Sequence, residues 1–482
     1  MQQRFLLNRP TASNNGPVML QDVKRIHLIG IGGIGVSAVA RGLLAMGFEV
    51  SGSDVRESQL TISIREEGAT VTIGHDAALI ENKDLVVYST AIPDTNPELI
   101  AARAADVRVL HRAEVLGAML DGWESFGVIG THGKGTVCAM ITSILEAAEA
   151  HPSFIIGGLL NEYGTNTRFD AQQNPRHLVV EIDESDGSLV HVRPKTLVVN
   201  NLEADHLNYY GDLETIRKTV IGVIDADADR SMAVLHAGDT GVRSLLPELS
   251  KNIAVTTCGF DSDLNGFNAD YIGLDLTVHA KGSAFRIEHD GKDLGRFEVT
   301  QPGRYNAMNA LVAATACLSF GVPVEAVRKG TQRYQGIENR FTVVDAGGVR
   351  VVKDYISHPT GMRRVLAAAK TLSDGPITAV FKPYRFTMIH YLGDEYSVAF
   401  EDADHTVITK LYTAGEVPIP GIDTEWLVGK IRQAGSEVRY IPEMDDIVPH
   451  LVEQAQPGQQ IIFFGGDDLF VLADALIDQL TD

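Results

Sequence analysis

Short apolar runs alternate with segments of helical spacing along most of the chain. Runs of this length bounded by turn residues are typical of buried strands, and apolar positions three or four apart favour helices. Alternation of strand and helix predicts a parallel sheet that binds its ligand at the carboxyl ends of the strands. The first predicted strands lie at residues 25–29, 48–54, 70–73, 84–88 and 107–110.

The same alternation returns twice further along the chain. The second block has predicted strands at 125–129, 177–182 and 196–200, a β-rich stretch near 253–300 and a helix at 301–320. The third has strands at 377–381, 406–409 and 460–464 and helices at 362–370 and 467–480. We therefore expect an α/β fold of three domains in series: a flexible leader (1–21), a Rossmann-like domain (22–122), a central P-loop domain of ATPase type (123–340) and a Rossmann-like C-terminal domain (341–482).

The composition narrows the class of protein. The 482 residues are 44% hydrophobic and carry a net charge of −22, which is ordinary for a globular protein but repels nucleic acid and anionic membranes. Three scattered cysteines predict neither a disulfide framework nor a zinc site. The chain has no apolar run long enough for a membrane span, and its first residues lack a signal-peptide core. We expect a cytoplasmic protein.

A glycine-rich segment, Gly-Thr-His-Gly-Lys-Gly-Thr at 130–136, lies between a predicted strand and a predicted helix. Backbone N–H groups at a helix N-terminus bind phosphate, a lysine adds charge, and a hydroxyl can ligate Mg²⁺. The motif departs from the P-loop pattern at Val128 and Gly135, so an ordinary glycine-rich turn is the alternative. We expect ATP and Mg²⁺ at Gly130, His132, Gly133, Lys134, Gly135 and Thr136, with Thr136 as a metal ligand.

A second glycine motif, G-x-G-x-x-G, occupies Gly30, Gly32 and Gly35 after the first predicted strand. The next predicted strand ends in Asp54. This arrangement is typical of nucleotide-binding β-α-β units. It is also found in NAD-dependent oxidoreductases, but that hypothesis leaves the segment at 130–136 without a role.

Acidic residues and a histidine follow two strands of the second block. Four acids end one strand, of which Glu181, Asp183 and Asp186 could bind a metal or a proton and Glu184 is the fourth. Glu203, Asp205 and His206 end another strand. If the two strands are adjacent, these side chains meet beside the phosphate loop, where a carboxylate and an imidazole can complete the coordination of Mg²⁺. The alternative is a pair of solvated acidic loops.

Together these motifs resemble the Mur ligases, most closely the members that accept L-alanine. The resemblance covers nearly the whole chain and preserves the order of the motifs. Any one motif is weak, but the ordered set is specific. It rests on the segments 26–35, 50–54, 74–76, 89–93, 130–134, 157–158, 164–166, 181–186, 203–206, 303–309, 340–341, 354–355, 358–360, 383–385 and 412–421.

The resemblance implies a function. Mur ligases use ATP to convert a carboxylate into an acyl phosphate, which an amine then attacks to form an amide. The implied substrates are a UDP-N-acetylmuramate-like carboxylate and an amino acid, in peptidoglycan biosynthesis for the cell wall. The implied protein is a cytoplasmic monomer or homodimer, with no nucleic-acid or membrane partner.

The resemblance also implies roles for individual residues. Catalysis would involve Lys134, Glu181, His206, His358 and Arg385, and the second Mg²⁺ would be held by Glu181 and His206. ATP would also contact Asn309, Arg340 and Asp354. The UDP-sugar would lie against Gly30, Gly32, Gly35, Asp54, Ser89 and Thr90, and the amino acid near Tyr355, His358 and Arg385.

The chain departs from the family's pattern mainly in its catalytic half. The family's Thr after the loop lysine is Gly135, a histidine and a glutamate of its Y-G-H-H-P-T-E motif are Ser357 and Gly361, and an arginine is Met388. Replacing a bidentate carboxylate donor by a thioether changes what a pocket can hold. We expect a ligase of this family whose amine substrate the sequence leaves open, L-alanine or another amine, or else a non-catalytic homologue that binds a nucleotide-sugar or a protein partner.

Overall fold

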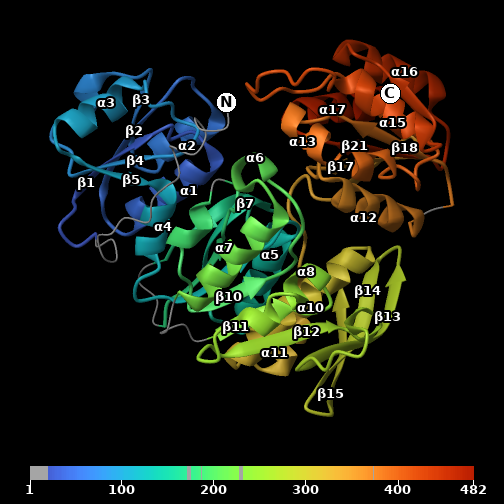
Figure 1. Ribbon diagram of the computed structural model, residues 1–482, viewed down its shortest axis with the longest axis horizontal. Coiled ribbons are helices and arrows are strands. Elements are labelled where there is room, and N and C mark those ends of the chain that lie inside the picture. Colours follow the sequence, from blue (N-terminus) through green and yellow to red (C-terminus); the bar gives the residue numbers. More distant parts are fainter. Residues whose placement is uncertain (1–19, 171–174, 186, 227–231, 373, 482) are drawn as a thin grey trace.

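The computed structural model describes residues 20–170, 175–185, 187–226, 232–372 and 374–481, which form three α/β bodies in chain order (Figure 1). The central body lies between the N-terminal and C-terminal bodies, so the predicted three-domain α/β architecture is confirmed. The boundaries 22–122, 123–340 and 341–482 stay a prediction. Of the predicted leader, residues 1–19 lie outside the described residues, and Leu20 packs against a hydrophobic core. Asp186 also lies outside the described residues.

The N-terminal body contains a five-stranded sheet in the order β3-β2-β1-β4-β5. Every pair in it is parallel, as the strand–helix alternation predicts. Buried Ile26, Leu28 and Val87 supply part of its core. The elements are β1 (Arg25–Ile29), α1 (Ile34–Ala45), β2 (Glu49–Asp54), α2 (Gln59–Glu66), β3 (Thr70–Ile73), β4 (Leu85–Tyr88), α3 (Pro97–Ala104), β5 (Arg108–His111) and α4 (Arg112–Met119).

The central body contains a ten-stranded sheet in the order β15-β14-β13-β12-β11-β10-β6-β9-β7-β8. The elements are β6 (Glu124–Ile129), α5 (Lys134–Ala147), β7 (Ser153–Leu160), β8 (Thr165–Arg168), β9 (His177–Glu181), β10 (Thr196–Val199), α6 (Leu207–Tyr210), α7 (Leu213–Asp225), β11 (Met232–His236), α8 (Thr240–Arg243), β12 (Val255–Phe260), α9 (Asp261–Leu264), β13 (Tyr271–His279), β14 (Gly282–His289), β15 (Lys292–Val299), α10 (Arg304–Phe320) and α11 (Val324–Arg333).

This central sheet is mixed rather than wholly parallel. The β-rich stretch predicted near 253–300 forms β12 and the antiparallel meander β13-β14-β15. The sequence analysis missed β7, β8 and β11. Within the stretch predicted to be β-rich, Asp261–Leu264 form a short helix, α9.

The C-terminal body contains a six-stranded sheet in the order β16-β17-β21-β18-β19-β20. Its first hairpin was not predicted; Gly347 and Gly348 turn it with φ of 59° and 80°. The elements are β16 (Thr342–Ala346), β17 (Val349–Asp354), α12 (Pro359–Lys370), β18 (Ile377–Phe381), α13 (Phe386–Tyr391), α14 (Gly393–Ser397), β19 (His405–Ile408), α15 (Thr424–Gln433), β20 (Val438–Tyr440), α16 (Ile447–Gln454), β21 (Gln460–Phe464) and α17 (Asp467–Thr481).

The two strands that carry the acidic residues are not adjacent, contrary to the expectation from sequence. β6 lies between β9 and β10 and pairs in parallel with both. Apolar Phe126 and Val128 of β6 are fully buried, which explains its place in the interior of the sheet. The carboxyl ends of β9 and β10 therefore flank the segment that follows β6.

Two further properties bear on the class of protein. Cys138, Cys258 and Cys317 are buried and unbonded to one another. Within the part of the chain that the structure describes, every helix is too short or too polar to cross a bilayer.

Candidate active site

The segment Gly130–Gly133 forms a turn between β6 and α5, and α5 begins at Lys134. Gly130 and Gly133 have φ of 143° and 74°, which a residue with a Cβ rarely adopts. A Cβ on Gly133 would also lie 2.6 Å from Oδ1 of Asn309. Glycine therefore lets the loop adopt this turn and pack closely on Asn309. The turn leads into the N-terminus of a 14-residue helix, where backbone N–H groups can bind phosphate.

Two asparagines after β10 hold this loop. The side chain of Asn201 accepts a hydrogen bond from the His132 N–H at 2.7 Å and donates one to the His132 carbonyl at 2.8 Å. Asn200 donates to the same carbonyl at 2.9 Å and to Oδ1 of Asn309 at 2.9 Å. The loop is thus bonded on its inner side to the neighbouring strand end.

Lys134 forms a buried ion pair. Its Nζ lies 2.8 Å from Oε1 of Glu184 and donates to the Gly130 carbonyl at 2.8 Å. Burial alone would lower the pKa of Lys134, but the negative charges of Glu184 and Glu181 outweigh it and raise that pKa. Lys134 therefore carries a positive charge at neutral pH, at the N-terminus of α5.

Glu181 lies on the other side of the same helix start. Its Oε2 accepts a hydrogen bond from the Gly157 N–H at 2.6 Å. A Cβ on Gly135 would lie 3.1 Å from that oxygen, so the glycine leaves space for the carboxylate. The hydroxyl of Thr136 pairs with the phenol of Tyr334. The unusual Gly135 is thus explained by its contact with Glu181.

A cavity of about 440 Å³ opens beside the phosphate loop. Its walls come mainly from the central and C-terminal bodies, and Ile34 is its contribution from the N-terminal body. Tyr355 donates to Oδ1 of Asp467 at 2.9 Å within this wall. The predicted site residues that line the cavity are His132, Gly133, Lys134, Gly135, Thr136, Glu181, Asn309, Arg340, Asp354 and Tyr355.

Arg340 and Asp354 lie together in the cavity wall. Nη1 of Arg340 is 4.0 Å from Oδ1 of Asp354, and its guanidinium is 5.9 Å from the centre of the Tyr355 ring. Burial raises the pKa of Asp354, an effect that the nearby Arg340 opposes. The structure brings these two residues and Asn309 to the cavity that the phosphate loop borders, and their role as nucleotide contacts stays a prediction.

His206 does not line this cavity. Its Nε2 lies 3.8 Å from Oε1 of Glu184 and 3.6 Å from Oδ2 of Asp205. Of the three predicted metal ligands, Thr136 and Glu181 line the cavity, while His206 lies near Glu184, the partner of Lys134. A shared ion would need these side chains to rearrange.

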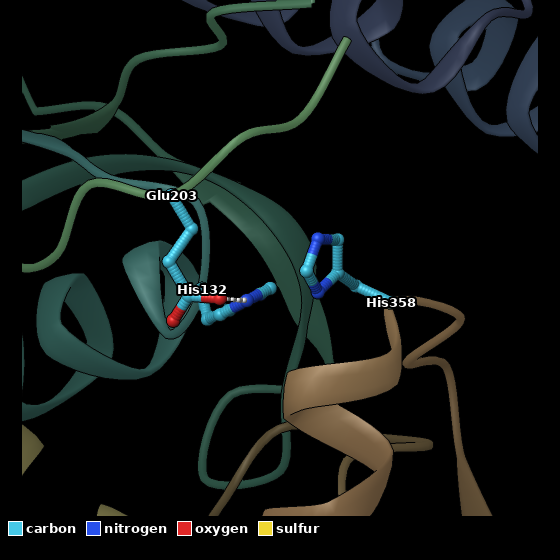
Figure 2. A group of neighbouring side chains, drawn as sticks. All are labelled: His132, Glu203 and His358. Carbon is cyan, nitrogen blue, oxygen red and sulfur yellow. Dashed lines mark ion pairs between the residues drawn. The ribbon is translucent and has the colours of Figure 1, made fainter. Parts of the chain in front are cut away.

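His358 is close to the phosphate loop, although the sequence analysis assigned it to the amino acid. Its ring centre lies 4.6 Å from that of His132, and Glu203 lies on the other side of His132 (Figure 2). Burial lowers the pKa of His132 to about 4, against the opposing effect of Glu203. Burial would raise the pKa of Glu203, but bonding to His132 and other polar neighbours lowers it to about 2.

The glycine motif of the N-terminal body forms the turn after β1. Gly30 has φ of 74°, and the Gly32 N–H donates to Oδ2 of Asp54 at 2.9 Å. A Cβ on Gly35 would lie 3.3 Å from Nη1 of Arg112. Ser89 and Thr90 follow β4, the neighbour of β1, so the predicted UDP-sugar residues share the carboxyl edge of one sheet.

Arg385 and Met388 lie outside the cavity lining. Arg385 has φ of 63°, its N–H donates to the Tyr412 carbonyl at 2.8 Å, and its guanidinium lies 5.1 Å from the centre of the Tyr384 ring. Met388 is partly buried against the core of the C-terminal body. Met388, which stands where the family's pattern has an arginine, therefore has a packing role.

Sequence reasoning missed the partners of the predicted residues. It named Glu184 as one of four acids without assigning the ion pair, and gave no role to Asn200, Asn201 or Arg364. A signal existed for the asparagines, because polar residues directly after a buried strand are positioned to hold a neighbouring loop. No comparable signal existed for Arg364, which belongs to another body.

Three family models match successive parts of the chain. The "Mur ligase family, catalytic domain" model matches residues 25–124, the "Mur ligase middle domain" model matches 128–317, and the "Mur ligase, glutamate ligase domain" model matches 339–466. Together they span the three bodies in order.

Similar proteins match over almost the full chain. The UDP-N-acetylmuramate–L-alanine ligase of Geobacter sp. (strain M21) is 34% identical, and that of Pelobacter propionicus is 36% identical; each match covers 96% of this chain and 99% of that protein. The solved UDP-N-acetylmuramate–alanine ligase of Thermotoga maritima has a TM-score of 0.76 at 24% identity, covering 94% and 98% of the two chains. The murein peptide ligase of Psychrobacter arcticus has a TM-score of 0.70 at 22% identity, covering 95% and 99%.

Proposed function

Since this chain belongs to the Mur ligase family, we propose that it joins an amino acid to the carboxylate of UDP-N-acetylmuramate in an ATP-dependent reaction. The reaction makes an amide bond and belongs to cytoplasmic peptidoglycan synthesis. Relatives that cover 96% of the chain are named as ligases of this substrate with L-alanine, which supports the proposal. A monomer or homodimer stays our prediction for the oligomeric state.

The observation that carries the proposal is the ion-paired Lys134 at the start of α5, in the wall of a cavity lined mainly by the central and C-terminal bodies. A carboxylate and a triphosphate repel each other, so their reaction needs fixed positive charge at the transferring phosphoryl group. Lys134 and the N–H groups of the phosphate loop supply that charge. Arg340 and Asn309 in the cavity wall are the residues we assign to the nucleotide.

Glu181, Thr136 and His206 are the residues that would hold Mg²⁺, which when bound screens phosphate charge. Glu181 and Thr136 already border the cavity. Mg²⁺ prefers oxygen ligands, which the carboxylate of Glu181 and the hydroxyl of Thr136 supply. Enclosure by the C-terminal body would keep water away from the reacting groups.

The substrates are assigned to different bodies. We assign the UDP-sugar to the turn at Gly30–Gly35 with Asp54, Ser89 and Thr90, and the amino acid to the region of Tyr355, His358 and Arg385. Met388 packs against the core and stands where the family's pattern has an arginine. The pocket therefore lacks one side chain that could donate hydrogen bonds to a carboxylate. The proposal therefore does not specify the amine substrate, which the following assay identifies.

The test is a product assay with the full chain. Protein, Mg-ATP and UDP-N-acetylmuramate are mixed with each amino acid in turn, and phosphate release is measured together with the mass of the product. We expect phosphate release only with an amino acid that appears in the product. L-Alanine, glycine and L-serine are the first three to compare, because they differ least in size.

Two outcomes would contradict the proposal. Absence of turnover with every amino acid, alongside measurable binding of the UDP-sugar, would identify a non-catalytic homologue. Quenching of nicotinamide fluorescence on addition of NADH, without binding of ATP, would favour an oxidoreductase instead.

A further inference from the structure

A cluster of two histidines and a glutamate lies at the junction of the central and C-terminal bodies. His132 belongs to the phosphate loop, Glu203 follows β10, and His358 precedes α12. One ligand atom from each residue lies within 4.8 Å of those of the other two. Figure 2 shows the His132 ring between the Glu203 carboxylate and the His358 ring.

The cluster is enclosed and held by its neighbours. His132 and His358 are 8% and 5% exposed. Nε2 of His132 is buried without a hydrogen-bond partner, and it points toward Oε2 of Glu203 at 3.5 Å. Asn201 holds the backbone of His132 by hydrogen bonds to both its N–H and its carbonyl. The buried imidazole nitrogen thus faces the Glu203 carboxylate across a distance longer than a normal hydrogen bond.

The remaining contacts leave ligand atoms for an ion. Arg364 binds Oε1 of Glu203 at 3.2 Å, so Oε2 is the oxygen on the side of His132. For His358, Nδ1 accepts from the Thr360 N–H at 3.3 Å and Nε2 lies 3.3 Å from the Ala204 carbonyl. These two long contacts are weak, and an ion that binds either nitrogen would replace one of them.

We propose that His132, Glu203 and His358 form a binding site for a first-row transition-metal dication, with Zn²⁺ as the preferred ion. Two imidazoles and one carboxylate are a common ligand set for Zn²⁺ with an open coordination position. Mg²⁺ prefers oxygen ligands in octahedral geometry, so this donor set selects against it. The positive charge of Arg364 opposes ion binding, but its bond to the outer oxygen keeps it off the face that the histidines share.

The site would connect two bodies of the protein. Two ligands come from the central body and the third from the residue that caps α12 in the C-terminal body. Zn²⁺ bound here would hold the phosphate loop and the start of α12 together, and so limit the relative motion of the two bodies. The test of this inference needs neither ATP nor an amino acid, although His132 and His358 also belong to the regions assigned above to ATP and to the amino acid.

The test is titration of Zn²⁺ alone into the chelator-stripped full chain, in buffer with excess Mg²⁺, followed by calorimetry. We expect one Zn²⁺ per chain at the cluster. His358→Asn should weaken binding at least about tenfold. Asparagine also accepts the N-cap hydrogen bond of Thr360, so α12 should keep its start. The matched control is His390→Asn, at an exposed histidine of the same body, which should bind Zn²⁺ as the unaltered protein does.

A spectroscopic readout identifies the ligands separately. Co²⁺ in place of Zn²⁺ should give visible d–d absorption that His358→Asn and Glu203→Gln lose and His390→Asn keeps. Far-ultraviolet circular dichroism without metal should be the same for all variants. Failure of the unaltered chain to bind Zn²⁺ in excess Mg²⁺ would overturn the proposal, as would undiminished binding by His358→Asn.

Discussion

At the scale of single residues, the Lys134–Glu184 pair places two charges in a largely buried position. Two charges removed from water lose solvation energy that their attraction only partly returns. Burial raises the pKa of Glu184, and Lys134 opposes that rise. The pair keeps Lys134 charged beside the cavity, from which an anionic ligand can reach it.

Lys134→Met should abolish ATP-dependent phosphate release and also destabilise the fold. We expect a loss of about 3–5 kcal/mol of unfolding free energy near neutral pH, because Glu184 is left buried without its partner. Its pKa stays above the unfolded value, so folding favours the protonated carboxyl. The deficit should therefore be smallest at acidic pH and grow as the pH rises through the ordinary carboxyl range. Calorimetry at several pH values measures this.

The double variant Lys134→Met/Glu184→Gln is the control for this prediction. It removes both charges, so it should recover most of the stability while remaining inactive. Phosphate release by either variant would contradict the role assigned to Lys134. An equal stability deficit in the double variant would contradict the explanation by an unpaired charge.

A second buried carboxylate, Glu98, has its pKa shifted in the opposite direction to that of Glu184. Glu98 is fully buried in the N-terminal body and bonds His27 at 2.8 Å, Ser53 at 2.8 Å and His75 at 2.7 Å. Burial would raise the pKa of Glu98, but these hydrogen bonds outweigh it and lower that pKa. Its stabilising contribution is therefore present above the unfolded carboxyl pKa of about 4.3 and is lost as the pH falls below it.

Glu98→Gln should cost about 1–3 kcal/mol at neutral pH, because the buried donors lose a charged acceptor. The difference from the unaltered protein should shrink as the pH falls below about 4. Urea denaturation monitored at several pH values tests this. Glu49→Gln, at an exposed carboxylate of the same sheet, should change little. A deficit that grows with acidification would contradict the prediction.

At the scale of elements, α11 packs directly on α5, the helix that begins at the phosphate loop. A Cβ on Gly330 of α11 would lie 2.3 Å from Cα of Ile144, so the two helix backbones meet at this glycine. Ser143 of α5 also donates to the Gly330 carbonyl at 2.9 Å. This close approach helps to position the helix on which Lys134 lies.

Gly330→Ala should destabilise the central body by about 1–3 kcal/mol, because the methyl group forces the helices apart. Alanine is the better helix former by about 1 kcal/mol, so a stabilised variant would contradict this account. The matched control is Gly222→Ala in α7, at an exposed helical position where a Cβ meets nothing within 4 Å. That variant should be stabilised by up to about 1 kcal/mol. Thermal unfolding of both variants provides the measurement.

At the scale of the whole molecule, polar contacts connect successive bodies. Arg112 of the N-terminal body lies 3.1 Å from Asp183, and Arg364 of the C-terminal body lies 3.2 Å from Glu203. Both arginines bind acids that follow strands flanking β6. A change in the relative position of the bodies would therefore alter contacts at the strand ends that flank the phosphate loop.

Arg364→Ala should loosen the contact between the central and C-terminal bodies. The pair is partly exposed, so we expect a change of about 1 kcal/mol, or roughly fivefold faster hydrogen exchange at the start of α12. Arg363→Ala, at the exposed neighbouring position of the same helix, should exchange as the unaltered protein does. Unchanged exchange in Arg364→Ala would mean that other contacts hold this junction.

Much of the fold could be predicted because local patterns are strong where strands are fully buried. β18 and β21, in which every residue is buried, have the bounds expected from their apolar runs, and so does β1, in which four of five residues are buried. The meander after β12 was expected only as β-rich sequence, since strands with one exposed face pair according to partners elsewhere in the sheet. The hairpin β16–β17 was missed because its polar and apolar residues alternate in short runs.

For the site, the sequence alone determined which residue types are available and where strands end. Lys134, Glu181 and the glycines of the loop were identified in this way, because a turn between a buried strand and a helix has few possible geometries. Only the tertiary structure decided that β6 separates the two acid-bearing strands, that Glu184 pairs with Lys134, and that His358 meets His132. Such contacts join residues far apart in the chain, and their distances depend on how sheets and bodies pack rather than on any local pattern.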